Sequence, residues 1–217
     1  QCIPEDTALW EINSFEKFLG ARRVMLSEEL NEFLAGITKM DTSKVEVSIA
    51  DMIAEGEHDG LEFKSSMRWD TKQNCLNKNL ERVILKTIAA FNNGYGDSGT
   101  LIIGVDDEGN VLGLENDLST LKGDDADAYE LHLRNLVNAE FGVQYSASNI
   151  KVRFHDIAGQ IVCAVTVSKG VAPLFVKDAD KNGTKVEKFF VRSGNSSDPI
   201  NNPSEIANYI SKRFKAA

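Results

Sequence analysis

The sequence predicts an α/β protein of the mixed α+β kind, in which helices flank a central, mostly antiparallel or mixed sheet and a helical extension precedes it. Three observations support this class: an amphipathic pattern near the N-terminus, a strand-helix-strand passage over residues 61–105, and a series of short strands after residue 150. The chain has 217 residues, 42% of them hydrophobic, which is enough for one sizeable core and an appendage.

The N-terminal extension is predicted from apolar side chains that recur at three- and four-residue steps between residues 7 and 37. Residues 40–47 have the composition of a linker. We therefore expect a helical extension with its linker over residues 1–47 and a main domain over residues 48–217. An amphipathic helix of this kind is typical of a packing or dimerising element, so a homodimer is one expectation.

The main domain begins with a helix, a strand and a second helix. Ser48 is a good N-cap for a short helix that ends near residue 54. Alternation over residues 61–65 predicts a strand with Glu62 and Lys64 on one face and an aromatic side chain on the other. Residues 79–92 have the period of an amphipathic helix.

Residues 94–99 are rich in glycine and predict a loop, which leads into an apolar strand over residues 100–105. The next five residues, 106–110, have the composition of a hairpin turn. A further helix is predicted over residues 125–141, where an acidic N-terminal end suits the helix dipole. Four strands and a final helix beginning at Pro203 complete the chain; the strands cover residues 150–154, 160–168, 174–177 and 188–192.

The charge is distributed unevenly along the chain. The formal net charge is −9, yet the residues from 151 onward hold 11 Lys and Arg against 6 Asp and Glu, a net of +5. The C-terminal third is therefore a candidate surface for a polyanion. Three well-spaced cysteines, no membrane-length apolar run and no signal pattern favour a soluble, cytoplasmic protein. Because the chain begins at Gln1, we expect that an upstream domain precedes it.

Carboxylates gather around the first predicted strand. Glu57 and Glu62 come before and within it, and Asp106 and Asp107 follow the strand after the long helix. Parallel strands joined by a helix place such ends side by side, where acidic groups can bind a hard divalent cation. The alternative interpretation, an ordinary turn and an ion pair between Glu62 and Lys64, stays open.

The residues after the 188–192 strand form a second candidate site. Arg192, Ser193, Asn195 and Ser196 combine a cation, a glycine turn and hydroxyls, which together can form a phosphate-binding concavity. A simple polar loop is the alternative.

Two further basic or aromatic signals point to nucleic acid. Lys188 lies near the Arg192 loop, and Trp69 is a candidate for stacking on a base, with a core position as the alternative. Lys78, Arg82 and Lys86 are four residues apart on the polar side of the 79–92 helix, where they face either phosphates or solvent.

Several other activities are excluded by the motifs. The glycine-rich loop lacks the GK[ST] ending of a Walker loop, so we expect no ATP. Residues 178–183 imitate a calcium loop, but its twelfth position is Phe189 where an acid is required. The three histidines have no zinc-like spacing, and no nucleophile triad is present.

Five short sequence blocks occur in order between residues 50 and 197, and their combination indicates a protein family more specifically than any one of them does alone. They are Glu57…Leu61-Glu62-Phe63-Lys64, Thr87-Ile88-Ala89-Ala90-Phe91-Asn92-Asn93, Gly99-Thr100-Leu101-Ile102-Ile103-Gly104-Val105-Asp106-Asp107, Gly113-Leu114 and Phe190-Val191-Arg192-Ser193-Gly194-Asn195-Ser196-Ser197. In this combination the chain resembles the Schlafen-type AlbA nucleic-acid-binding domain, as a bacterial member.

The resemblance implies a mixed α/β domain that binds DNA or RNA, and some Schlafen proteins are metal-dependent endoribonucleases. Their acidic triad falls here on Glu57, Glu62 and Asp107, which would hold Mg²⁺ or Mn²⁺ while Lys64 steadies the substrate phosphate. The chain departs from the pattern in its longer glycine loop, Gly94-Tyr95-Gly96-Asp97-Ser98, which changes access to the site.

We therefore expect an RNA- or DNA-binding domain that contacts phosphates through its basic C-terminal third. A metal-dependent endoribonuclease with a Glu/Glu/Asp site is the first alternative, and a helix-mediated dimerisation module is the second.

Overall fold

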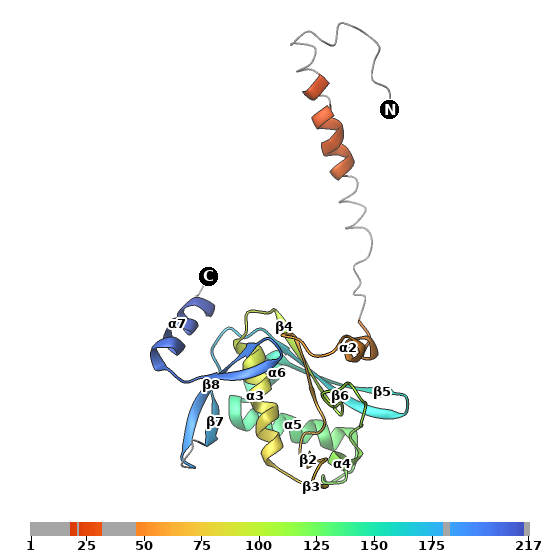
Figure 1. The fold of residues 1–217 in the computed structure, drawn as a ribbon, viewed down its shortest axis with the longest axis vertical. Helices are drawn as coiled ribbons and strands as arrows, with labels where there is room; N and C mark the ends of the chain where they lie inside the picture. The colour runs from red at the N-terminus through yellow and green to blue at the C-terminus, as the bar shows by residue number, and fades with distance from the viewer. Residues whose placement is uncertain (1–17, 21, 32–46, 180–182, 215–217) are drawn as a thin grey trace. The chain divides into compact units, whose positions relative to one another are not determined.

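The chain divides into two compact units, Gln1–Val47 and Ser48–Ala217. The computed structural model describes residues 18–20, 22–31, 47–179 and 183–214 (Figure 1). In the first unit, residues 18–20 and 22–31 are helical, as predicted. The rest of the predicted 7–37 helix and most of the predicted linker lie outside the described residues.

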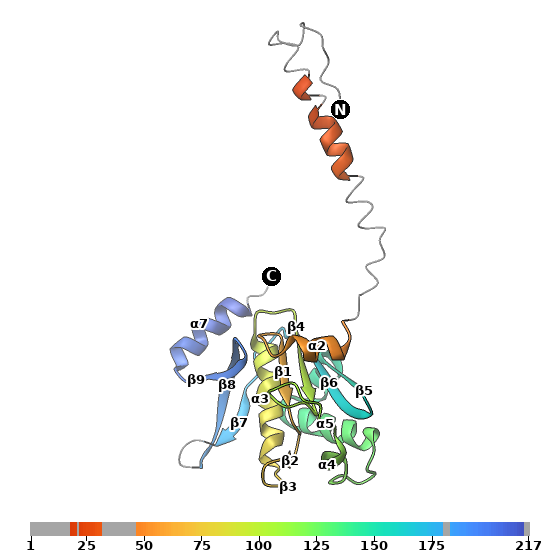
Figure 2. The same ribbon diagram turned by 45° about the vertical axis from the view of Figure 1, so that its right-hand side comes forward.

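A four-stranded mixed sheet forms the centre of the second unit (Figure 2). The strands in spatial order are β1 (Leu61–Lys64), β4 (Ser98–Ile103), β6 (Gln160–Ser168) and β5 (Ile150–Ile157). β1 runs parallel to β4, and the other neighbours are antiparallel. A parallel pair needs a crossover connection, and helix α3 (Asn79–Asn93) lies within it. The predicted mixed α+β class is confirmed.

A second, three-stranded sheet consists of β7 (Val176–Ala179), β8 (Lys185–Ser193) and β9 (Ser196–Ile200), all antiparallel. Helix α3 contacts β4 and β6 of the first sheet and all three strands of the second, so it lies between the two sheets (Figures 1 and 2). The final helix α7 (Pro203–Arg213) packs against β9 and is capped by the Asn202 side chain.

Shorter elements complete the second unit. They are α2 (Ile49–Glu55), the hairpin β2 (Trp69–Asp70) and β3 (Cys75–Leu76), α4 (Glu115–Leu118), α5 (Ala126–Phe141) and α6 (Val143–Asn149). The predicted cap of α2 is present, because Ser48 Oγ accepts the N–H of Asp51 at 3.1 Å. Among the described helices, none has both the length and the apolar character that crossing a membrane requires.

Several elements were not expected from the sequence, namely the β2–β3 hairpin, α4, α6 and β9. The sequence predicted a strand that ends at Arg192 and then a phosphate-binding concavity or a simple polar loop, but β8 continues to Ser193 and Ser196–Ile200 form a further strand, β9. β9 is an edge strand, where the missing N–H of Pro199 is tolerated. Helix α6 was not predicted because its seven residues are mostly polar or small and carry no apolar period.

The core has two parts on opposite faces of the mixed sheet. The larger cluster contains α3 and α5 side chains, among them Ile88 and Leu133, packed on Leu101 and Val165. The smaller cluster contains Leu61 and Phe63 of β1, with α2 packed against it. Burial of both apolar faces of the sheet supplies the main stabilisation of the unit.

A buried amide pair fixes the C-terminal end of α3. Asn92 and Asn93 are fully buried, and the Asn93 side chain donates to the carbonyl oxygens of Leu174 and Phe190, both at 2.9 Å. A Cβ atom at Gly170 would lie 1.9 Å from Asn92 Oδ1, so only glycine fits there. These bonds join α3 to the second sheet and fix the start of the glycine-rich loop.

Candidate functional site

The two predicted glutamates lie at the beginning of the mixed sheet. Glu57 precedes β1, and its Oε1 accepts the N–H of Phe63 at 2.7 Å. Glu62 is on β1 and shares a face with Lys64, whose Nζ lies 2.6 Å from Glu62 Oε1. The predicted alternation, with Phe63 in the core and Glu62 beside Lys64, is therefore present.

The turn after β4 distinguishes the two neighbouring aspartates. Asp106 accepts hydrogen bonds from the N–H groups of Glu108 (3.1 Å) and Asn110 (2.8 Å), and it also accepts one from the Asn110 side chain (3.0 Å). Burial acts in the opposite direction, but these bonds lower the pKa of Asp106. Asp106 therefore stabilises the turn, whereas Asp107 is exposed and lies on the rim of a pocket with Lys64.

Glu57 is close enough to the other acidic side chains to be affected by their charge. Burial raises the pKa of Glu57, and the negative charges of Glu62 and Asp107 raise it further. The hydrogen bond from Phe63 and the charge of Lys64 act in the opposite direction. We call Glu57, Glu62, Lys64 and Asp107 the acidic site.

The acidic site does not have the geometry of a metal site. In the part of the chain that the structure describes, no three His, Cys, Asp or Glu side chains are arranged to hold one ion. Both oxygens of Glu62 already face cations, Oε1 with Lys64 and Oε2 with Arg192. A hard cation would have to displace one of these partners. The residues as placed therefore do not fit Mg²⁺ or Mn²⁺, and the metal site stays a prediction.

Arg192 was predicted to contact phosphates. Its side chain is 5% exposed, and its N–H donors are already bonded to acceptors within the protein. Its guanidinium pairs with Glu62 and donates to the carbonyl oxygens of His58 at 2.8 Å and Asp59 at 3.3 Å. The same group lies 4.9 Å from the centre of the Phe91 ring. Arg192 thus joins β8 to the segment that precedes β1.

The other predicted residues of this loop lie at the turn between β8 and β9. The Ser196 hydroxyl bonds to the Ser193 carbonyl oxygen at 3.2 Å and to Asp198 Oδ2 at 2.6 Å, and so stabilises the hairpin. Ser193 and Asn195 are exposed. The phosphate-binding role of these three residues stays a prediction.

Trp69, the predicted stacking residue, lines a pocket of 340 Å³ together with Lys64, Lys72 and Asp107. Its indole Nε1 is buried and has no hydrogen-bond partner in the described part of the chain. The structure therefore brings Trp69 and Lys64, which are five residues apart, into one pocket with Asp107, which is distant from both in the sequence.

A pocket of 410 Å³ between the beginning of α3 and the β7–β8 hairpin is lined by three cations and two carboxylates, Glu140 and Asp178. Arg82, Lys177 and Lys185 line it, and none of these side chains forms an ion pair within the described residues. The spacing of Lys78, Arg82 and Lys86 had pointed to this side of α3. Lys177 and Lys185 carried no signal beyond the basic composition of the C-terminal third.

Asp178, which also lines this pocket, forms ion pairs with two more cations. Its Oδ2 lies 3.0 Å from both Lys86 Nζ and Lys188 Nζ. Burial would raise the pKa of Asp178, but the two lysines lower it to about 2. Lys188, predicted from the sequence, is therefore part of this cluster. We call Arg82, Lys86, Lys177, Lys185 and Lys188 the basic pocket.

A mixed α+β domain with an acidic site and a basic pocket is consistent with a nucleic-acid-binding or nuclease-like protein. Residues 57–201 match the protein family described as Schlafen, AlbA_2. The chain belongs to this family, as its sequence predicted.

Comparison with other proteins adds one solved structure. No curated protein matches the chain. The DIP2311 protein of Corynebacterium diphtheriae is similar to it with 20% sequence identity and a TM-score of 0.48, over 90% of this chain and 34% of that one. The chain thus spans about a third of the length of that protein.

Proposed function

We propose that this chain binds the sugar-phosphate backbone of RNA or DNA and that the basic pocket is the principal contact. Membership of the Schlafen AlbA_2 family is consistent with a nucleic-acid-binding or nuclease-like role. The observation that carries the proposal is that three cations from α3, β7 and β8 line one pocket, with two more, Lys86 and Lys188, beside the Asp178 carboxylate that also lines it.

The charge of the basic pocket is opposite to that of the whole chain. Its five cations face two carboxylates, Asp178 and Glu140, which leaves a net of +3 in a chain whose formal net charge is −9. Arg82, Lys177 and Lys185 form no ion pair among the described residues, and cations of this kind attract phosphates and release the counterions of the nucleic acid on binding.

Arg82 supports a direct contact with an anion. Its Nη1 is buried and has no hydrogen-bond partner in the described residues. An unsatisfied buried donor costs free energy, so a rearrangement of the Arg82 side chain that exposes Nη1 to a phosphate oxygen would recover it through a charge-assisted hydrogen bond. Glu140, the nearest carboxylate on α5, instead accepts the backbone N–H of Lys177 at 2.5 Å.

Fluorescence anisotropy with labelled RNA and DNA tests the proposal. We expect the double variant Arg82→Gln/Lys185→Gln to weaken binding at low salt by about 10- to 100-fold and to reduce the slope of log K against log salt by about 1.5. Asp178→Asn, which removes a carboxylate and releases Lys86 and Lys188, should tighten binding by roughly threefold, because one repulsive charge is lost.

The matched control is Lys122→Gln. Lys122 is exposed just before α5, whereas Glu140 of the basic pocket is near the other end of that helix. It should leave affinity and salt slope unchanged. An equal loss in the control, or no measurable binding of any RNA or DNA at low salt, would overturn the proposal.

Nuclease activity at the acidic site is the second candidate. It is favoured by the mutual influence of Glu57, Glu62 and Asp107 and by Lys64 and Trp69 beside them. Glu57, a carboxylate with a raised pKa, is a candidate general acid or base, and Asp107 and Lys64 line the neighbouring pocket. The homodimer, the upstream domain and the cytoplasmic location stay predictions.

A further inference from the structure

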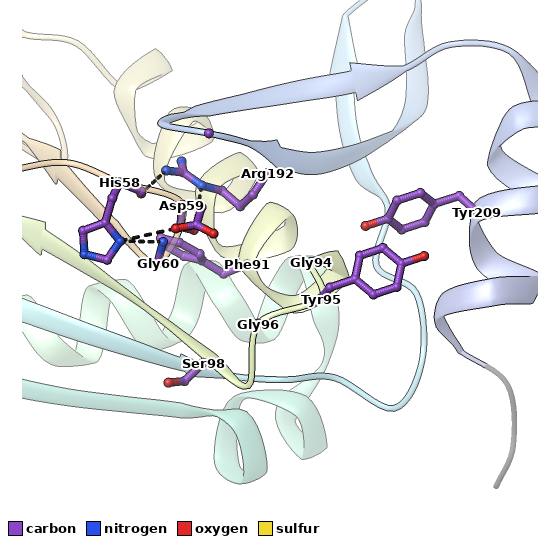
Figure 3. Close-up of a pocket in the computed structure, with 11 residues that line it drawn as sticks. His58, Asp59, Gly60, Phe91, Gly94, Tyr95, Gly96, Ser98, Arg192 and Tyr209 are labelled. Atoms are coloured by element: carbon purple, nitrogen blue, oxygen red, sulfur yellow. Dashed lines mark hydrogen bonds and ion pairs between the residues drawn. The ribbon is translucent and has the colours of Figure 1, made fainter.

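A third pocket, of 330 Å³, lies between the glycine-rich loop, the turn before β1 and helix α7 (Figure 3). Two tyrosines, Tyr95 and Tyr209, lie on one side of it, and His58 and Asp59 lie on the other, with the Phe91 ring between them. Its volume is within the ~300–1,000 Å³ range of small-molecule sites. Neither the acidic site nor the basic pocket includes these side chains.

Tyr95 forms an exposed but well-anchored aromatic surface in this pocket. Its ring is 60% exposed and packs edge-to-face on Tyr209, with 5.5 Å between ring centres. Its carbonyl oxygen accepts a bond from Lys169 Nζ at 3.2 Å, and the carbonyl oxygen of Gly94 accepts one from Arg213. The loop that carries Tyr95 is therefore fixed on both sides of the ring.

Tyr209 is itself anchored in the core. Its hydroxyl donates to the Asn93 carbonyl oxygen at 3.0 Å, and its ring contacts Phe189 with 5.6 Å between centres. Because the Tyr209 hydroxyl is already bonded, this residue supports the Tyr95 ring through packing. A ring held in this way loses little conformational entropy when a planar group stacks on it.

The charges of the pocket disfavour a phosphate. The guanidinium of Arg192 is neutralised by Glu62, and the Asp59 side chain is 85% exposed and carries a negative charge. A carboxylate accepts hydrogen bonds and repels a phosphate. The group that fits is planar, uncharged and carries N–H donors on its edge, which describes a nucleobase with an amino or imino group.

We propose that the pocket binds an unpaired nucleobase, stacked on Tyr95 with its polar edge toward Asp59 and His58. This inference rests on the proposed function, because the basic pocket would hold the phosphates of the same strand. Arg82 and Gly94 are separated by about 18 Å along the axis of α3. A strand of a few nucleotides spans that distance, within the ~4–16 nucleotide footprint of single-strand binding domains.

The inference also gives a role to the part of the loop that departs from the family pattern. Residues 94–98 bring Tyr95 to the pocket, and the glycines on either side of it, Gly94 and Gly96, line the same pocket. The chain therefore binds single-stranded nucleic acid in preference to a duplex, in which bases are stacked and paired.

Two labelled strands of about 12 nucleotides, one of deoxycytidine and one of abasic sugar-phosphate, separate base binding from phosphate binding. We expect the intact chain to bind the deoxycytidine strand about tenfold more tightly than the abasic strand. Tyr95→Ala should reduce that ratio to about one and leave abasic binding unchanged, because the ring is the stacking surface. Tyr95→Phe should preserve the ratio.

The matched control is Leu131→Ala, which truncates a side chain that is 62% exposed on α5, and it should preserve the ratio too. Equal affinity of the intact chain for the two strands, or a ratio that Tyr95→Ala does not change, overturns this inference and leaves the proposed function standing. Failure of both strands to bind at low salt overturns the proposed function and the inference together.

Discussion

The acidic site and the basic pocket differ in how many of their charges form ion pairs within the fold. In the acidic site, Glu62 is 8% exposed and each of its oxygens faces a cation, Lys64 or Arg192. In the basic pocket, Arg82, Lys177 and Lys185 have no paired carboxylate in the described residues. Glu62 is thus paired within the fold, whereas these three cations form no ion pair among the described residues.

This difference shows that the kind of residue does not reveal whether its charge is available. Arg192 had the attributes of a phosphate ligand in the sequence, but its guanidinium is used to join β8 to the turn before β1. Buried ion pairs cost desolvation energy, so they persist only where the charges and hydrogen bonds are satisfied. A charged side chain can interact with a ligand where such pairing is incomplete.

Arg192→Met should have the largest effect on stability. It leaves Glu62 buried beside Lys64 alone and removes the bonds to two carbonyl oxygens, so we expect the free energy of unfolding to fall by about 3 kcal/mol. Urea denaturation followed by circular dichroism measures the change.

Lys188→Met provides the comparison for this effect. It breaks an ion pair with Asp178 in which the side chains are 26% and 16% exposed, and Lys86 remains beside Asp178, so the loss should be less than about 1 kcal/mol. Equal losses in the two variants would show that Arg192 is no better integrated into the fold than the basic pocket.

Lys64→Met should sharpen the prediction of a metal site. Because Lys64 occupies Oε1 of Glu62, its removal frees an oxygen and should increase Mn²⁺ affinity by about tenfold, as measured by calorimetry. Incubation of structured RNA with Mn²⁺ or with EDTA then shows whether the ion supports cleavage.

Lys72→Met serves as the control for metal binding. Lys72 lines the same pocket as Lys64, but it makes no bond to Glu62, so its removal should change Mn²⁺ affinity little. Binding that is equally tight in the intact chain and in Lys64→Met, and that survives Glu57→Gln, would place the ion outside the acidic site.

Glu57→Gln should have the smallest effect, on the pH dependence of stability. Burial raises the pKa of Glu57 above its ordinary value of 4.5, so the folded chain retains the proton more strongly than the unfolded chain. This contribution is fully present below pH 4.5 and is lost as pH rises through the folded-state pKa.

The intact chain should therefore lose stability relative to Glu57→Gln as pH rises from 4.5 toward neutrality. Urea titrations at a series of pH values measure the difference. The same substitution at Glu205, exposed in the first turn of α7, is the control. A difference that grows in the opposite direction would contradict the raised pKa.

Local patterns sufficed for most of the fold. Ser48 predicted the start of α2, alternation predicted β1, and the apolar period predicted α3 to within one residue of its observed end. These signals work because capping, pleating and helical periodicity depend on neighbours in the sequence. β9 and α6 carried no such signal, and pairing or packing with distant segments determines them.

The sequence by itself determined the family, the mixed α+β class and the residue types of the acidic site. Only the tertiary structure decided which charges are paired, because Glu62 forms its ion pair with Arg192 across 130 positions of the chain, whereas Arg82 and Lys177 line one pocket as two like charges. Pairing depends on distance, geometry and burial, which the fold sets and the local sequence does not record.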